Sequence, residues 1–117
     1  MIKIARDMKE TKIQAEILKY LSQKGIFCWR QNNGAVWDAK LGMYRSHSGM
    51  AGVADILAVH NGNLIAVECK TNKGKMSPAQ FLFKKRLEEA GGIYILARSV
   101  EDVTRPNVPF DTGKQAC

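Results

Sequence analysis

The sequence predicts a single α/β domain with a mixed central sheet flanked by helices. Helical and strand patterns follow one another in the order helix, strand, ribbon, hairpin, helix, strand. Both strands of the hairpin are apolar on both faces, which is typical of central strands covered on each side. With 117 residues the chain can bury one core but not two. We therefore expect one domain over residues 1–103 and an irregular C-terminal tail over residues 104–117.

The first helix is predicted over residues 10–24, and Gly25 ends it. At 100° per residue, Glu10 and Gln14 lie on the apolar side of this helix, whereas Glu16 lies off it. Glu10 is then a polar residue aimed at the core side, although an acidic residue in a first turn also complements the helix dipole. The apolar stripe itself comprises Ile13, Ile17, Leu18 and Leu21.

A strand is predicted over residues 26–30, followed by a two-stranded ribbon over residues 35–46. Trp29 and Arg30 alternate faces, so we expect one of them to pack and the other to be exposed. Basic side chains with an aromatic between them suit phosphate contacts and base stacking, although a solvated loop with a few basic residues also explains them. This group comprises Arg30, Lys40, Tyr44, Arg45 and His47.

The next two strands form a hairpin around Asn61 and Gly62. This dipeptide is the strongest short-range hairpin signal, because a type I′ turn needs positive φ at both central residues. His60 then pairs with Asn63. A four-residue loop gives the same register, whereas a three-residue loop would shift it.

Counting outward in this register places Asp55 directly opposite Glu68, with Lys70 on the same face. Opposed like charges destabilise a sheet, so a pair among apolar residues calls for a reason. A divalent cation supplies one, because Mg²⁺ prefers carboxylate, water and phosphate oxygens. Lys70 beside it would orient an attacking water or stabilise phosphoryl charge. The alternative is an exposed Glu-Lys strand end, with Asp55 as a turn residue.

A second helix is predicted to begin at Ser77, after a basic loop over residues 71–75. Ser77 is its expected N-cap, Pro78 its first residue, and Gln80 completes a capping box. The box alone is enough to explain Gln80. A further strand over residues 93–97 and a short helical turn complete the domain.

The composition of the chain indicates which kinds of partner and site are compatible with it. A net charge of +7 and a pI near 9.5 favour a polyanionic partner, either nucleic acid or an anionic surface. Three cysteines without framework spacing indicate reduced thiols in the cytoplasm. The presence of only two histidines and the absence of a C-x-x-C argue against a structural zinc site. No apolar run approaches the ~18 residues of a membrane span.

Several motifs resemble a known family. G-V-A-D-I followed by E-C-K resembles the core of the PD-(D/E)XK nucleases, with Ala54 where the family name has Pro. More specifically, residues 10–103 are similar to the virus-type replication-repair nuclease domain, VRR-NUC. The other matching segments are E-T-K-I-Q, W-R-Q-N-N-G, G-M-A-G-V-A-D-I, G-K-M-S-P-A-Q and A-G-G-I-Y-I-L-A-R-S-V-E-D-V. The resemblance implies a restriction-endonuclease-like fold with the core order αβββαβ.

The resemblance also implies a site and an activity, that of a metal-dependent DNA endonuclease, a hydrolase. Mg²⁺ or Mn²⁺ would be held by Glu10, Asp55, Glu68 and the backbone carbonyl of Cys69. Lys70 and Gln80 are expected to act on the attacking water. Gln14 is expected to support a metal ligand or to contact the substrate DNA. The residues expected to contact DNA phosphates are Arg30, Arg45, Lys73, Lys75 and Lys84.

Small standalone members of this family resemble Holliday junction resolvases and form homodimers. We therefore expect a homodimer acting on branched DNA in phage-type replication and repair, without membrane association. A flap or duplex nuclease is the alternative enzyme. A non-catalytic DNA-binding module and a structural subunit of a viral replication complex are alternatives of another class. The complete set of acids with Lys70 argues against these, because a copy without activity has little reason to keep opposed carboxylates.

Overall fold

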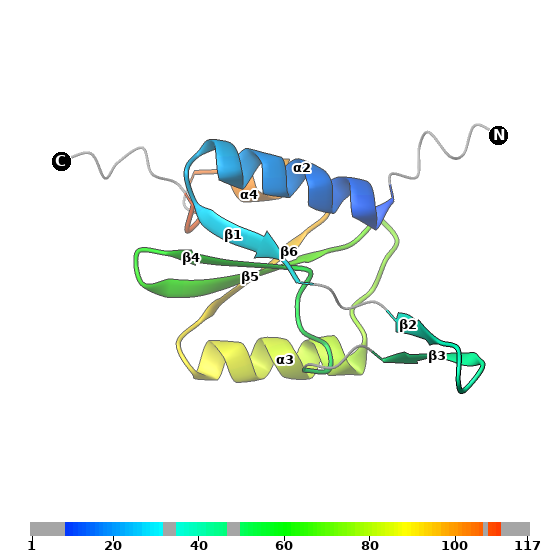
Figure 1. The fold of residues 1–117 in the computed structure, drawn as a ribbon. Helices are drawn as coiled ribbons and strands as arrows, with labels where there is room; N and C mark the ends of the chain where they lie inside the picture. Colours follow the sequence, from blue (N-terminus) through cyan, green and yellow to red (C-terminus); the bar gives the residue numbers. More distant parts are fainter. Residues whose placement is uncertain (1–8, 32–34, 47–49, 107, 111–117) are drawn as a thin grey trace.

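The computed structural model describes residues 9–31, 35–46, 50–106 and 108–110 (Figure 1). Four strands form the main sheet in the order β1-β4-β5-β6, and β2 pairs with β3 in a separate ribbon. β5 and β6 are parallel while the other pairs are antiparallel, so the sheet is mixed as predicted. The elements are α2 (Glu10–Gln23), β1 (Phe27–Arg30), β2 (Ala35–Asp38), β3 (Met43–Ser46), β4 (Ile56–His60), β5 (Asn63–Cys69), α3 (Pro78–Glu89), β6 (Ile93–Ala97) and α4 (Glu101–Thr104).

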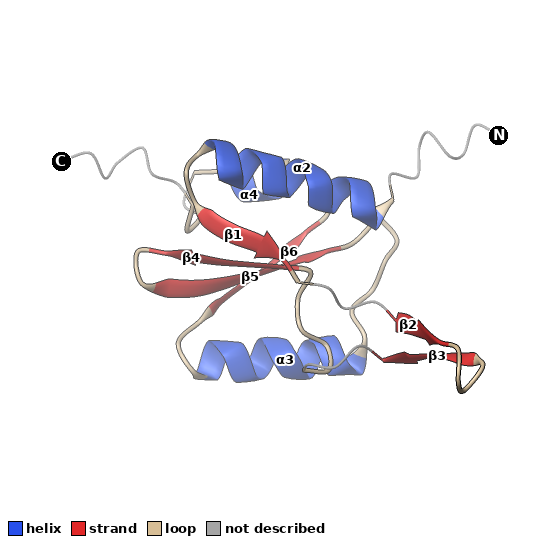
Figure 2. Cartoon of the chain, viewed as in Figure 1, coloured by secondary structure: helices blue, strands red, loops and turns tan. Residues whose placement is uncertain are grey.

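Helices cover both faces of the main sheet. α2 and α4 lie over one face and α3 lies over the other (Figure 2). α3 connects β5 to β6, because two parallel neighbours need a crossover of this kind. The β2–β3 ribbon projects from the end of the sheet where α2 and α3 begin (Figure 1). Within the described ranges, no helix combines the length and the apolar character that crossing a membrane requires.

The β4–β5 hairpin has the predicted turn and register. Asn61 and Gly62 have φ angles of 53° and 80°, as a type I′ turn requires. His60 pairs with Asn63, and the ladder continues in step to the first residue of β4. One position further out, Asp55 lies opposite Glu68. The turn chemistry therefore decides which two carboxyl groups meet.

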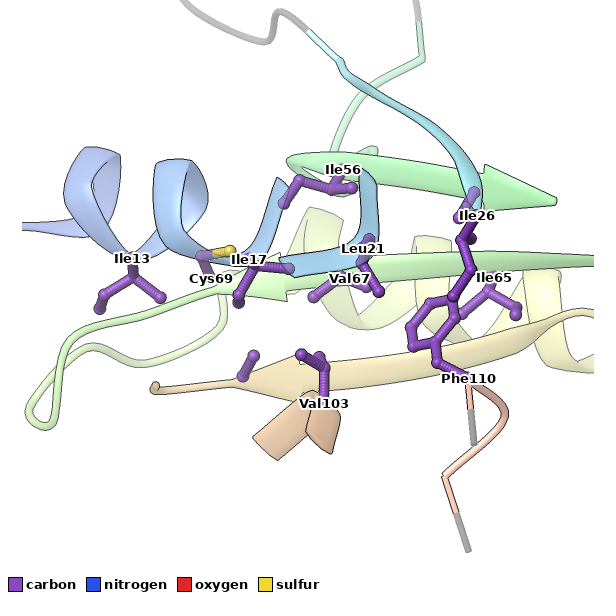
Figure 3. Packing of buried hydrophobic residues seen from close by; sticks show 12 residues of the cluster. Ile13, Ile17, Leu21, Ile26, Ile56, Ile65, Val67, Cys69, Val103 and Phe110 are labelled. Carbon is purple, nitrogen blue, oxygen red and sulfur yellow. The ribbon is translucent and has the colours of Figure 1, made fainter. Parts of the chain in front are cut away.

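The main core lies between α2 and the sheet (Figure 3). Ile13, Ile17 and Leu21 are at most 1% exposed and belong to one cluster with Val67 of β5. Full burial of such side chains stabilises the fold by about 1.5–3 kcal/mol each. Leu18, the fourth member of the predicted stripe, is only partly buried at the margin of this cluster.

Two further side chains complete this core. The Cys69 thiol is fully buried, as expected for a packed cysteine. Phe110 is also fully buried, in the same cluster as Ile26 and Ile65 (Figure 3). The described part of the chain after Thr104 has no helix or strand. The packed domain nevertheless extends past the predicted boundary at residue 103, because an aromatic ring beyond it fills the core.

Two expectations about exposure are wrong. Trp29 and Arg30 are both exposed, although one was expected to pack. The reason is topological: β1 is an edge strand, and α3 packs chiefly against β6 at the opposite edge. Glu16 is half-buried rather than exposed.

Candidate active site

β4 begins and β5 ends at the end of the sheet where α2 and α3 begin (Figure 1). Asp55 immediately precedes β4, and Glu68 is the penultimate residue of β5. The two carboxyl groups are close enough for the charge of Asp55 to raise the pKa of Glu68. Two neighbouring carboxylates repel each other, so a retained proton or a bound cation would stabilise the pair near neutral pH.

Backbone N–H groups hold Asp55 at its carboxyl and at its own backbone carbonyl. Its Oδ2 accepts the N–H of Cys69 at 2.8 Å, across the hairpin. Its own backbone carbonyl accepts the N–H of Gln31 at 2.7 Å, which extends the β1–β4 ladder by one residue. Burial raises the pKa of Asp55, while the Cys69 N–H and the nearby charges of Lys70 and Arg30 oppose that rise.

Glu68 is the one buried charged residue in the described part of the chain, at 2% exposed. Its Oε2 accepts the amide Nε2–H of Gln80 at 2.9 Å and lies 3.7 Å from Lys70 Nζ. Its Oε1 is buried without a hydrogen-bond partner. Burial, and then the negative charge of Asp55, raise the pKa of Glu68 to about 8. Because burial raises the pKa of both carboxyl groups, the pair tends to retain a proton when no cation is bound.

Gln80 has two hydrogen-bonding roles. Its Oε1 accepts the backbone N–H of Ser77 at 2.8 Å, and its own backbone N–H is accepted by Ser77 Oγ, so the predicted capping box is present. Its Nε2 donates to Glu68, as described above. The first turn of α3 thus combines the capping box with an amide donor to Glu68, while the expected role of Gln80 at the attacking water stays a prediction.

The donor set fits a hard divalent cation. Asp55 and Glu68 offer carboxylate oxygens, and the unpartnered Oε1 of Glu68 has a ligand position free. The Cys69 sulfur points into the core, so only the backbone of this residue faces the site. Among the described residues, no cluster of three His, Cys, Asp or Glu side chains has metal-binding geometry. Asp55 and Glu68 are therefore the carboxyl pair at the centre, and the expected place of Glu10 as a third ligand stays a prediction.

Glu10 acts on the pair from a distance. It begins α2 and is half-buried, and its negative charge contributes to the raised pKa of both Glu68 and Cys69. Gln14, one helical turn later, is also half-buried. Glu16, predicted to lie off the stripe, is half-buried too, so burial does not separate it from Glu10 and Gln14, whose place at the site stays a prediction.

The residues expected at DNA phosphates are dispersed around this end of the domain. Arg30 ends β1, and Lys73 and Lys75 lie in the loop before α3; all three are exposed. Lys84 lies one turn after Gln80 but forms an ion pair with Glu88 at 3.0 Å. The side chains of Tyr44 and Arg45, and the whole of His47, fall outside the described residues.

Comparison with known proteins gives a likeness in fold but none in sequence. No family model matches the sequence, and no curated protein matches it either. Among solved structures, the chain is similar to a VRR_NUC domain protein, at 16% sequence identity over 83% of each chain and a TM-score of 0.60. Identity this low supports the fold alone. The predicted restriction-endonuclease-like arrangement is confirmed on that basis.

Two further residues position the site: Gly52, where a small residue was expected to allow a close backbone approach or a tight turn, and Arg98, which was not singled out from the sequence. Gly52 has φ of 75°, and a Cβ there would lie 2.2 Å from the carbonyl oxygen of Ala79, in the first turn of α3. Arg98 donates from Nη1 to the carbonyl oxygens of Thr71 and Gly74, which fixes the loop that carries the basic residues. The G-x-x-G spacing gave a signal for Gly52, but nothing local marks Arg98.

Proposed function

We propose that this protein is a metal-dependent DNA endonuclease. The observation that carries the proposal is the buried Glu68 carboxyl beside the half-buried Asp55, with the Lys70 ammonium and the Gln80 amide on the same Glu68 oxygen. Buried, directly interacting carboxyl groups with raised pKa values are rare outside functional sites. The likeness to a VRR_NUC domain protein supports a nuclease over other metal chemistries.

Each residue has a role that follows from its contacts. Asp55 and Glu68 Oε1 would hold Mg²⁺ or Mn²⁺, with Glu10 contributing negative charge and the Cys69 carbonyl a further oxygen. A cation bound there supplies charge neutralisation at the phosphoryl oxygens. Lys70 would orient a water or stabilise charge on the phosphoryl group, and Gln80 would position that water. The net charge of +7 supplies attraction for the polyanion.

For the substrate we propose branched DNA of the kind that resolvases cut, handled by a homodimer in replication and repair. Two copies would present two sites to two strands. A flap or duplex nuclease is the second candidate. The basic loop of Lys73 and Lys75 favours it equally, because phosphate contacts carry no information about branching.

Cleavage of a labelled panel tests the proposal. Duplex, flap, fork and four-way junction would be incubated with Mg²⁺ or Mn²⁺. We expect cleavage by the natural protein, none by Asp55→Asn, and unchanged cleavage by the control Glu101→Gln, whose exposed carboxylate begins α4. Full activity in Asp55→Asn would contradict the site.

Binding measurements separate catalysis from attachment. In Ca²⁺, Lys70→Ala should bind junction DNA nearly as well as the natural protein, yet fail to cleave it when Mg²⁺ is supplied. Lys70→Ala that cleaves normally would remove its catalytic role. A protein that binds every DNA but cuts none would be the non-catalytic module instead. Light scattering gives the mass, and equal affinity for junction and duplex in a verified dimer would count against the resolvase.

A further inference from the structure

One half of a sheet face is left without a helix. α3 packs through Phe83 on the β5–β6 side, against Ala66 and Tyr94. On the β1 side of the same face, a row of apolar side chains remains open to solvent. Its members and their exposed fractions are Phe27 at 69%, Trp29 at 37%, Val59 at 38% and Leu64 at 40%.

The strand register places this open face beside the carboxyl pair. Phe27 pairs with Val59, which pairs with Leu64, and Trp29 pairs with Leu57. Residues directly across an antiparallel ladder share a face. Gln31 is opposite Asp55, and Asp55 is opposite Glu68, so these three residues form a second row across the sheet. Gln31 is two residues after Trp29, so this second row lies on the same face as Trp29. The row that contains Trp29 and the row that contains Asp55 and Glu68 are two residues apart along the strands, which is about 7 Å.

Trp29 is held in place by its neighbours. Its indole Nε1–H donates to the side-chain Oε1 of Gln31 at 3.2 Å. The N–H of Gln31 in turn donates to the backbone carbonyl of Asp55. The ring centroid of Phe27 lies 5.4 Å from that of Trp29, with the ring planes 47° apart. The two exposed rings therefore have a fixed position relative to Asp55.

An exposed aromatic pair next to a positive charge is the combination that binds single-stranded nucleic acid. Arg30, the exposed last residue of β1, starts from the opposite face of the strand, and its charge acts on Asp55 at the strand end. Bases inside a duplex are stacked on each other and have no free face for a protein ring. Unpaired bases do, and a separation of about 7 Å corresponds to roughly two stacked nucleotides at 3.4 Å each.

We propose that Phe27 and Trp29 form a stacking platform for unpaired bases next to the phosphate that enters the Asp55–Glu68 site. The inference rests on the proposed nuclease function and, between its two substrate candidates, favours the flap over the four-way junction. The protein would prefer nucleic acid that is single-stranded beside the cut, such as a flap or a fork, over a continuous duplex. The continuity of the open face with the candidate active site favours this occupant over a second copy of the chain.

Fluorescence and affinity test the platform. Trp37→Phe leaves Trp29 as the single tryptophan, and a single-stranded oligonucleotide or a blunt duplex is titrated into it in Ca²⁺. We expect the single strand to quench Trp29 and the duplex to leave its emission nearly unchanged. In the natural background, Trp29→Leu should weaken single-strand binding about 5- to 100-fold and duplex binding less than about twofold.

Matched variants separate stacking from other effects. Trp29→Phe should retain most of the single-strand affinity, because an aromatic ring remains, and Phe27→Leu should act in the same direction as Trp29→Leu. Leu82→Ala, an exposed apolar residue on α3, is the control and should change neither affinity. Normal single-strand binding in both leucine variants, or equal losses on single strand and duplex, would overturn the platform.

Two more readouts identify which idea fails. If the natural protein is a dimer and Trp29→Leu makes it monomeric, the face joins two copies and the platform is wrong. If it cleaves DNA and Asp55→Asn does not, but the leucine variants keep the natural preference among flap and duplex, only the platform fails. Quenching by the single strand without any cleavage in Mg²⁺ or Mn²⁺ would remove the nuclease function and leave a single-strand-binding surface.

Discussion

Replacing Glu68 by Gln should make the metal-free protein less sensitive to pH. Glu68 is buried, and its pKa in the folded protein is raised from 4.5 to about 8. Between these two values the folded chain holds a proton that the unfolded chain releases. The free energy of unfolding therefore falls as pH rises through this window, by about 1.4 kcal/mol per pH unit at most. From about pH 5 to about pH 7.5, the loss approaches about 3 kcal/mol.

Urea unfolding in EDTA, followed by circular dichroism across this pH range, measures the effect. Other groups titrate in both proteins, so the quantity of interest is the difference between Glu68→Gln and the natural chain. We expect the variant to be of equal stability near pH 5 and more stable by roughly 1–3 kcal/mol near pH 7.5, since its neutral amide has no charged form to desolvate. Glu16→Gln, half-buried on α2, is the matched control and should keep the natural slope.

Adding a divalent metal should counteract the loss of stability at higher pH. Mg²⁺ should stabilise the natural protein most near pH 7.5 to 8, where the carboxyl pair is ready to ionise, and should have little effect on Glu68→Gln. Identical pH profiles for the natural protein and Glu68→Gln would refute the reasoning. They would show that Glu68 is already ionised in the folded state, with its charge balanced by Lys70.

Three further predictions follow from single contacts. Glu10→Gln should impair cleavage at least tenfold while Glu16→Gln stays near normal, and the reverse pattern would mean that Glu10 has no part in the site. Gly52→Ala should lower the melting temperature and the activity together, because its Cβ would overlap the Ala79 carbonyl; a normal melting curve would contradict that contact. Phe110→Ala should cost about 3–5 kcal/mol in urea unfolding, and a loss under about 1 kcal/mol would show that the ring is not part of the core.

Local chemistry allowed much of the fold to be predicted from the sequence. The Asn61–Gly62 turn fixed the hairpin register, and with it the meeting of Asp55 and Glu68, because a type I′ turn leaves no choice of pairing. The capping box was equally local, since its partners are three residues apart.

Long-range packing was not predictable in the same way. The exposure of Trp29 depends on where α3 lies across the sheet, which no pattern within β1 records. The same is true of Phe110. The sequence around it has the composition of an irregular tail, and its burial depends on packing against residues far away in the chain. The two carbonyl contacts of Arg98 join segments more than twenty residues apart.

The capping box determines which end of the Gln80 amide faces the carboxyl pair. A glutamine amide can normally rotate by half a turn and exchange its oxygen with its nitrogen. In Gln80 that exchange would set nitrogen against the Ser77 N–H and oxygen against Glu68, so both ends resist it. The start of α3 therefore dictates that Glu68 Oε2 is always occupied by a donor and that Oε1 is the oxygen left to bind. Fraying of one helical turn would release this constraint, so a change as distant from the chemistry as Ser77→Ala would blur which oxygen the site presents.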